Sequence, residues 1–348
     1  GVPETGRVND WYCHPSARHW CSEQAAASAR SFHASLPGYA PTPLVGLPSV
    51  AVELGVGRLL VKDESSRLGL PAFKVLGASW ACQQVLDRQP GATLVTATDG
   101  NHGRAVARVA AQLGTTATVF VPSVMQQGPA DLIASEGAQV VRVDGDYDQT
   151  VAAAAEYARA DGDRALVQDT AWPGYEDVPA WIVEGYATLL EEVDETLGRA
   201  PDLVVVPVGV GSLAQAVVTH YRRAGSSHPA VLSVEPDTAA CLLTSLSHGR
   251  PTSVPTAATV MAGLNCGTVS SAAWPVLQRG CDAAVVVTDA QALRASSDLM
   301  ALGVASGPCG AATLAGARAA LTDPARRGQL DLPDDAVVAL LSTEGLPS

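Results

Sequence analysis

The sequence predicts a doubly wound α/β protein, in which helices cover both faces of parallel sheets. Two observations indicate this fold class. Strand-like and helix-like segments alternate along the chain from about residue 58 onward. Several strand-like runs, such as VVVPV and VVALL, are apolar on both faces, which is typical of central parallel strands that helices cover on each side. The 348 residues provide enough chain for one large or two medium domains with their own cores.

The expected elements follow from apolar runs, from helical periodicity and from the turn residues between them. After an N-terminal arm, a helix is predicted over residues 22–36 and an extended, proline-punctuated loop over 37–43. The elements that follow are strand 58–62, helix 77–86, strand 93–98, helix 102–113, strand 117–121, helix 130–136, strand 139–143, helix 149–159, strand 165–168, helix 181–197, strand 203–207, a helical stretch at 214–221, and strands 231–235, 283–288 and 336–341.

The domain organisation is predicted from what the chain lacks. We find no internal repeat, no low-complexity tract and no linker rich in Gly, Ser or Pro. A second domain would therefore be inserted into the first rather than joined to its end. We expect a large discontinuous domain from residues 1–84 and 171–348, with a smaller α/β domain, 85–170, inserted into it.

The charge balance excludes several classes of partner. Thirty-five acidic against 22 basic side chains give a net charge of −13, which would repel nucleic acid and anionic membrane surfaces. The sequence has no apolar run of about 18 residues and no secretory leader. We expect a cytoplasmic protein with no nucleic-acid partner and no membrane partner.

The seven cysteines are scattered and include no Cys-x-x-Cys pair, which argues against a disulfide framework and against a zinc ribbon. Cys13, His14, His19 and Cys21 lie within nine positions, and all four side chains can bind zinc. Their spacing matches no standard zinc finger. We therefore expect a partly ordered N-terminal arm and no metal site.

Lysine is nearly absent, since Lys62 and Lys74 are the only two among the 22 basic residues. Arginine cannot replace a lysine that must form a Schiff base. Lys74, in AFKVLGAS, has apolar neighbours at a helix start, which would lower the pKa of its amine and make it a nucleophile. The alternative is a lysine that extends to solvent. Lys62 precedes Asp63 and Glu64 and is interpreted as a salt-bridge partner.

Three loops follow predicted strands at the carboxyl edge, where ligands of open parallel sheets bind: 98–103 (TDGNHG), 209–213 (GVGSL) and 342–345 (STEG). In GVGSL the glycines allow successive amides to face one point before a helix, which suits a phosphate. The alternative is a glycine turn required for packing. The loop matches neither a dinucleotide fingerprint nor a P-loop.

A Schiff-base lysine combined with a phosphate loop implies pyridoxal phosphate. From about residue 32 to residue 345, the chain resembles the fold-type-II pyridoxal-phosphate enzymes, the group of threonine dehydratase and tryptophan synthase β, and within it the diaminopropionate ammonia-lyases. The resemblance rests on PGYAPTPLVGLP, VKDESSRLGLPAFKVLGAS, TATDGNHGRAVA, VQDTAWPGYEDVPAWIVEGYATL, VPVGVGSLA, MAGLNCG and STEG. TDGNHGR together with QDTAW and GY is specific to the ammonia-lyase branch.

The resemblance implies roles for individual residues. Lys74 would be the Schiff-base lysine, Asn101 would hydrogen-bond the phenolic oxygen of the cofactor, and Thr343 would face its pyridine nitrogen. A neutral hydroxyl at that nitrogen makes the ring a milder electron sink, which favours β-elimination over transamination. The residues implied to hold the phosphate through backbone amides are Gly209, Val210, Gly211, Ser212 and Leu213.

Two carboxylates are implied to determine the substrate. Asp99 would accept a Cα proton on the face opposite Lys74, so that one site could act on both enantiomers. Asp169 would pair with a second ammonium, on the β carbon of the substrate. The alternatives are a turn residue for Asp99 and a helix cap for Asp169. His102 is interpreted as a packing or hydrogen-bonding residue rather than a base.

The resemblance implies elimination of 2,3-diaminopropionate to pyruvate and two ammonia by a homodimer. The chain departs from the branch at Gly128–Pro129, where Glu-Arg is expected, at Pro308–Cys309, where Glu-Ser is expected, and after STEG, where an extension is expected. Three alternatives remain open. They are β-replacement on another β-substituted amino acid, a serine or threonine dehydratase, and a non-catalytic relative that binds the cofactor.

Overall fold

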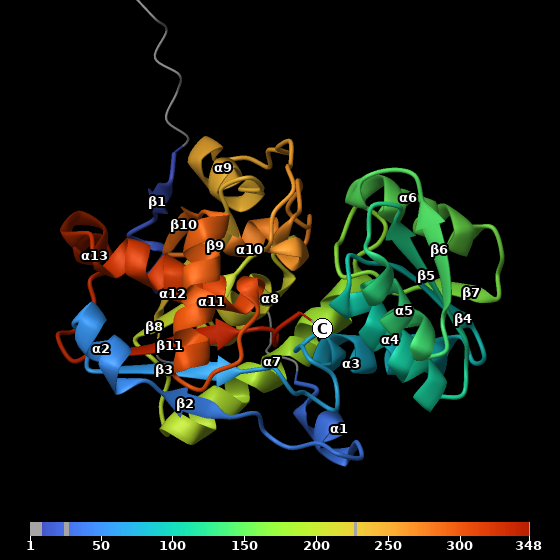
Figure 1. Ribbon diagram of the computed structural model, residues 1–348, viewed down its shortest axis with the longest axis horizontal. Coiled ribbons are helices and arrows are strands. Elements are labelled where there is room, and N and C mark those ends of the chain that lie inside the picture. Colours follow the sequence, from blue (N-terminus) through green and yellow to red (C-terminus); the bar gives the residue numbers. More distant parts are fainter. Residues whose placement is uncertain (1–8, 24–27, 226–227, 348) are drawn as a thin grey trace, which may run out of the picture.

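Two lobes, each built on a largely parallel sheet, lie next to each other in the computed structural model, which describes residues 9–23, 28–225 and 228–347 (Figure 1). The large lobe has a seven-stranded sheet with the order β1-β10-β9-β8-β11-β3-β2, and the small lobe has a four-stranded sheet with the order β6-β5-β4-β7. The strands are β1 (Trp11–Cys13), β2 (Leu44–Gly46), β3 (Arg58–Asp63), β4 (Thr93–Ala97), β5 (Ala117–Pro122), β6 (Gln139–Val143), β7 (Arg164–Leu166), β8 (Leu203–Pro207), β9 (Ala230–Pro236), β10 (Ala283–Val287) and β11 (Val337–Ser342).

The strand pairs are parallel except at the two edges of the large sheet, where β1 pairs with β10 and β2 with β3 in the antiparallel sense. This arrangement confirms the predicted α/β class with parallel sheets. The small sheet lies within the segment 85–170 that the sequence predicted as an inserted domain, although the domain boundaries themselves stay a prediction.

The helices are α1 (Arg30–Ser35), α2 (Pro48–Leu54), α3 (Val75–Arg88), α4 (Asn101–Gln112), α5 (Gln127–Ser135), α6 (Tyr147–Arg159), α7 (Asp177–Leu197), α8 (Ser212–Tyr221), α9 (Cys241–His248), α10 (Trp274–Gly280), α11 (Asp289–Ala301), α12 (Pro308–Leu321) and α13 (Pro324–Leu330).

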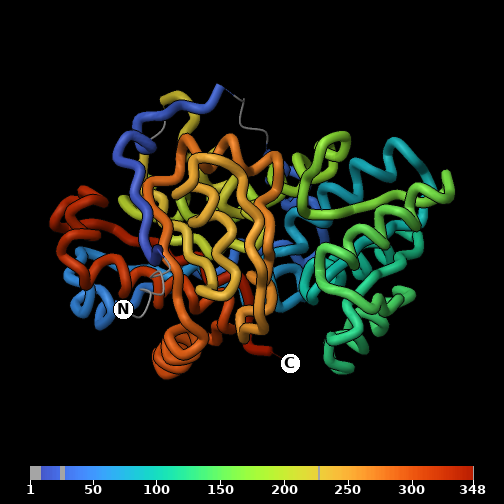
Figure 2. Tube along the Cα trace, turned by 90° about the horizontal axis from the view of Figure 1, so that it is seen from above, coloured from blue at the N-terminus to red at the C-terminus, as the bar shows by residue number. Residues whose placement is uncertain are grey.

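The N-terminal segment differs from the prediction. Residues 9–23 run along the outside of the large lobe, where Trp11–Cys13 forms an edge strand that the sequence did not predict (Figure 2). Among the described residues of the predicted helix 22–36, Arg30–Ser35 are helical and residues 22, 23, 28 and 29 are not. Ser22 donates its backbone N–H to the carbonyl of Arg222 instead, and residues 24–27 lie outside the described part of the chain. A tertiary contact therefore holds the residue at which the predicted helix would begin.

The described residues contain neither a group of metal-binding side chains nor a membrane-spanning helix. Over residues 9–23, 28–225 and 228–347, no three His, Cys, Asp or Glu side chains gather in a group that could hold a metal ion. In the same ranges, no helix has the length and apolar character needed to cross a membrane.

The crossing of α3 and α7 fixes the start of α3, where Lys74 lies. A Cβ atom on Gly77 would meet Cε1 of Tyr186 at 2.6 Å and the carbonyl oxygen of Ile182 at 2.9 Å. A Cβ atom on Gly185 would meet the carbonyl oxygen of Leu76 at 2.3 Å. Because each glycine faces the other helix, the two backbones approach more closely than any side chain would allow.

Lys62 does form a salt bridge, but its partner is distant in sequence. Its Nζ lies 2.7 Å from Oε2 of Glu192 on α7 and also donates to the carbonyl oxygen of Thr42. Arg67 joins the same group by pairing with Glu192 and with Glu64. The charged side chains of this group are fully buried and have compensating charges, so Lys62 is held away from any reactive role.

Candidate active site

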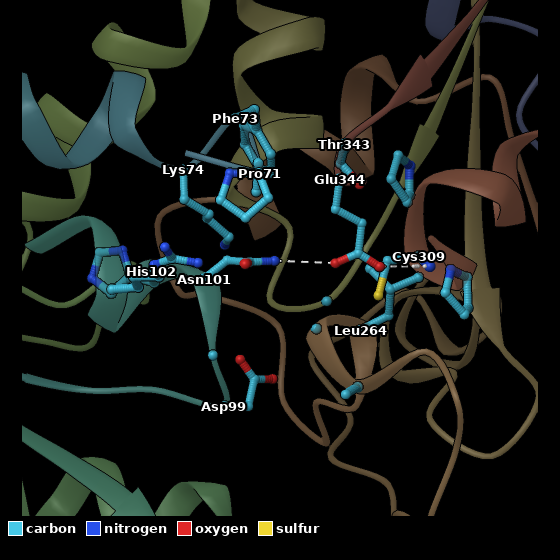
Figure 3. Close-up of a pocket in the computed structure, with 18 of the residues that line it drawn as sticks. Pro71, Phe73, Lys74, Asp99, Asn101, His102, Leu264, Cys309, Thr343 and Glu344 are labelled. Atoms are coloured by element: carbon cyan, nitrogen blue, oxygen red, sulfur yellow. Dashed lines mark hydrogen bonds between the residues drawn. The ribbon is translucent and has the colours of Figure 1, made fainter. Parts of the chain in front are cut away.

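A cavity of about 240 Å³ opens between the two lobes at the carboxyl ends of β4, β8 and β11. The three loops that the sequence indicated, 98–103, 209–213 and 342–345, all contribute to its wall, and the start of α3 adds Lys74 (Figure 3). The sequence-predicted site residues all line this one cavity: Lys74, Asp99, Asn101, Asp169, Gly209, Val210, Gly211, Ser212, Leu213 and Thr343.

Lys74 does not extend to bulk solvent. Its Nζ donates to Oδ2 of Asp169 at 2.9 Å and lies 5.3 Å from the ring centroid of Phe73. Burial acts to lower the pKa of Lys74, but the adjacent Asp169 carboxylate outweighs it and raises the pKa above its usual value. The predicted lowering of the Lys74 pKa is therefore wrong in this structure. The apolar residues next to Lys74 in the sequence do not reveal Asp169, which lies 95 positions further along the chain.

Asp169 is buried and carries its charge. Burial alone would raise the pKa of this carboxyl, but the Lys74 ammonium lowers it well below its usual range. Its other oxygen, Oδ1, accepts from Tyr147 at 3.4 Å and from the Gln168 side chain at 3.3 Å. Asp169 caps no helix, since α7 begins only at Asp177. The carboxylate is thus a preformed site for an ammonium group.

Asp99 approaches the cavity from the loop after β4, and Figure 3 shows it separated from Lys74, with Asn101 between them in this view. Burial raises the pKa of Asp99 to about 6, although Lys74 opposes the shift. A carboxyl with a pKa near neutrality can both take up and release a proton under physiological conditions. His102 is buried, and its Nε2 lies 2.9 Å from the carbonyl oxygen of Val167, which agrees with a hydrogen-bonding role.

The GVGSL loop presents backbone amides to the cavity. The N–H groups of residues 209–213 donate no hydrogen bond to any other residue that the structure describes. Gly211 has φ of 100°, and a Cβ atom there would meet Leu277 at 3.0 Å, so glycine is required. The hydroxyl of Ser212 donates to the carbonyl oxygen of Asp169, which ties this loop to the ammonium site. Unpaired amides at the start of α8 fit a phosphate, and Lys74 fits an aldehyde.

Several residues at the site were not singled out from the sequence. Tyr147, Cys266 and Glu344 also line the cavity. Oε2 of Glu344 accepts a hydrogen bond from Nδ2 of Asn101 at 3.1 Å. The STEG motif, directly after a buried strand, is the sequence signal that marks Glu344 as well as Thr343. Pro129, Pro308 and Cys309, at the two departures from the expected branch pattern, also lie in the wall.

Comparisons with known proteins give matches over most of the chain. The family model for the pyridoxal-phosphate dependent enzyme matches residues 35–343. The chain is 37% identical to diaminopropionate ammonia-lyase of Escherichia coli strain K12, over 93% of this chain and 89% of the relative. The crystal structure of the Escherichia coli enzyme in complex with D-serine superposes with a TM-score of 0.87 at 33% identity, and covers 96% of this chain and 94% of the other. The structure of that enzyme with an aminoacrylate-PLP azomethine reaction intermediate gives a TM-score of 0.86 at 34% identity, over 97% of this chain and 94% of the other.

Proposed function

The chain belongs to the pyridoxal-phosphate dependent enzyme family, in its diaminopropionate ammonia-lyase group, and we propose that it converts 2,3-diaminopropionate and one water to pyruvate and two ammonia. The cofactor is pyridoxal phosphate and the substrate is a small amino acid. The observation that carries the choice of substrate is the 2.9 Å contact between Asp169 and an ammonium group, that of Lys74.

The cofactor, when bound, supplies an electron sink that makes the Cα proton of an attached amino acid acidic. Lys74 would hold its aldehyde carbon covalently, and the amides of residues 209–213 would hold its phosphate. Asn101 would donate to its phenolic oxygen, and the Thr343 hydroxyl would face its ring nitrogen. These roles are proposals that rest on the position of each residue in the cavity wall.

Asp169 would select a substrate with two amino groups. Once Lys74 is engaged by the cofactor, its ammonium no longer compensates the Asp169 carboxylate. A buried carboxylate without a cation is strongly disfavoured. The β-ammonium of diaminopropionate would restore the lost ion pair, whereas the hydroxyl of serine would leave the charge uncompensated.

Two groups would handle the Cα proton. Lys74 lies at the start of α3 and Asp99 on the loop after β4, so they reach the cavity from different elements. Above a pH of about 6, Asp99 is ionised and can accept a proton. Lys74, once released as a free amine, can accept one as well. Two bases from different elements would allow the site to process both enantiomers.

The test is to measure pyruvate and ammonia released from D- and L-2,3-diaminopropionate, serine and threonine. We expect diaminopropionate to have the highest kcat/KM and to give two ammonia per pyruvate. A higher kcat/KM for serine or threonine would contradict the substrate assignment. Consumption of diaminopropionate without pyruvate would indicate capture of the product by a second nucleophile. The cytoplasmic location and the homodimeric state stay predictions. Light scattering would test the homodimeric state by measuring the molar mass in solution.

A further inference from the structure

Glu344 connects the two lobes through the wall of the cavity. It follows β11 in the large lobe, and its Oε2 accepts from Nδ2 of Asn101, the first residue of α4 in the small lobe, at 3.1 Å (Figure 3). Its other oxygen, Oε1, accepts from the backbone N–H of Cys309 at 3.1 Å, in the first turn of α12. One carboxyl group therefore serves two donors on elements that are remote in sequence.

The surroundings of Glu344 are shaped to its side chain. A Cβ atom on Gly307 would lie 2.8 Å from Oε1 of Glu344 and 2.3 Å from the carbonyl oxygen of Gly345, so only glycine fits there. The first turn of α12 favours a negative charge at this place. Burial raises the pKa of Glu344, while the contacts with Cys309 and Asn101 act against the rise. The contacts fix both oxygens of the carboxyl group.

The chemistry of the two contacts constrains the orientation of Asn101. The Asn101 amide and the Cys309 backbone each present an N–H donor to Glu344, and a carboxylate offers an acceptor oxygen to each. A glutamine has one acceptor oxygen, so it cannot accept at both of these oxygen positions. Because the Cys309 N–H is fixed in the backbone, only the Asn101 amide is free to turn. With Glu344 in place, Asn101 keeps its NH₂ group toward the acceptor.

We propose that Glu344 is a positioning residue that holds the Asn101 amide with its NH₂ group turned inward, so that the second N–H, and not the carbonyl oxygen, meets the phenolic oxygen of the cofactor. This inference rests on the proposed function, because it takes Asn101 as the contact of that oxygen. An N–H donor stabilises the ionised phenolic oxygen, whereas a carbonyl oxygen in its place would repel it. Glu344 would thus tune the cofactor through Asn101.

The experiment compares Glu344→Gln with Glu344→Ala in the holoenzyme, and records the absorbance spectrum of the bound cofactor and its dissociation constant. Glutamine would give its oxygen to Cys309 and its NH₂ to Asn101, which would reverse the Asn101 amide. We expect a shift of the cofactor band to shorter wavelength and about tenfold weaker binding, the loss typical of one hydrogen bond to a charged group. Alanine, which leaves Asn101 free to turn either way, should shift the band less.

A purely structural role predicts the opposite order, because glutamine has nearly the shape of glutamate and alanine leaves a cavity. A Glu344→Gln spectrum and dissociation constant equal to the wild type, or a larger effect of alanine, would overturn the proposal. If Glu344→Gln does not fold, the proposal is tested with the double variant that combines Glu344→Ala and Asn101→Ala. Its effect on cofactor binding should equal that of Asn101→Ala alone, and additive effects would refute the proposal. A wild-type chain without a cofactor band would instead refute the proposed function.

Discussion

Replacing Asp169 with asparagine should change which substrate the protein prefers. The substitution keeps the shape of the side chain and removes its charge, so the effect on diaminopropionate reports the ion pair with the β-ammonium. For serine, which carries no second ammonium, the substitution removes an uncompensated charge. We therefore expect kcat/KM for diaminopropionate to fall far more than kcat/KM for serine.

The size of the effect follows from the contact that the structure contains. An ammonium lies 2.9 Å from the Asp169 carboxylate, which corresponds to a Coulomb attraction of about 6 kcal/mol at an effective dielectric constant of about 20. Desolvation of the two charges offsets part of this attraction, and removing one partner of a buried pair costs about 3 kcal/mol or somewhat more. The ratio of kcat/KM for diaminopropionate to that for serine should therefore fall by about a hundredfold.

The assay measures initial rates of pyruvate release from both substrates for the wild type and for Asp169→Asn. Glu235→Gln is a matched control, because Glu235 is fully buried, lies outside the cavity wall, and accepts hydrogen bonds from the backbone N–H groups of Leu242 and Leu243. The control should leave the ratio unchanged. An equal loss for both substrates in Asp169→Asn would refute the argument that this carboxylate recognises the second amino group.

Three further outcomes are expected. Because Asp99 must be ionised to accept a proton, turnover of the D-enantiomer should rise with pH through the pKa of Asp99, which burial raises to about 6 while Lys74 is charged. Asp99→Asn should slow the D-enantiomer more than the L-enantiomer, and equal losses in initial rate would remove the stereochemical role of Asp99. Burial lowers the pKa of His33 from 6.5 to about 4, so the stability that neutral His33 contributes is present above pH 6.5 and is lost as the pH falls toward 4. Denaturant titrations should show a loss of up to about 3 kcal/mol in the free energy of unfolding. An equally steep decline in His33→Gln would contradict this assignment. Gly77→Ala should destabilise the fold by about 1–3 kcal/mol, since its Cβ would lie 2.6 Å from Tyr186, and an unchanged melting temperature would show that α3 and α7 can separate at little cost.

The sequence predicted the central strands and the three loops at the cavity because both leave local signals. Buried parallel strands are continuous apolar runs, and the site loops follow them directly. The edge strands Trp11–Cys13 and Leu44–Gly46 were not predicted. A strand of three residues is too short to show an alternating pattern, and each of these strands is defined by its hydrogen bonds to the neighbouring strand. The helices from α9 to α13 were not predicted except by the general alternation of elements.

Contacts between distant residues account for the parts of the site that sequence reasoning missed. The raised pKa of Lys74 depends on Asp169, 95 residues further along the chain, and the apolar neighbours of the lysine predicted the opposite direction. Glu344 contacts Asn101 across 243 residues. The motifs identified the residues of the site, while their charge states and orientations depend on the three-dimensional fold.

Borohydride reduction of the holoenzyme followed by peptide mass spectrometry locates the covalent bond between protein and cofactor. The chain provides an internal control, because Lys62 is the only other lysine and is fully buried in a salt bridge with Glu192. We expect the reduced adduct on Lys74 alone, and none in Lys74→Ala. An adduct on Lys62, or no adduct in a wild-type protein that still releases pyruvate, would contradict the assignment of Lys74.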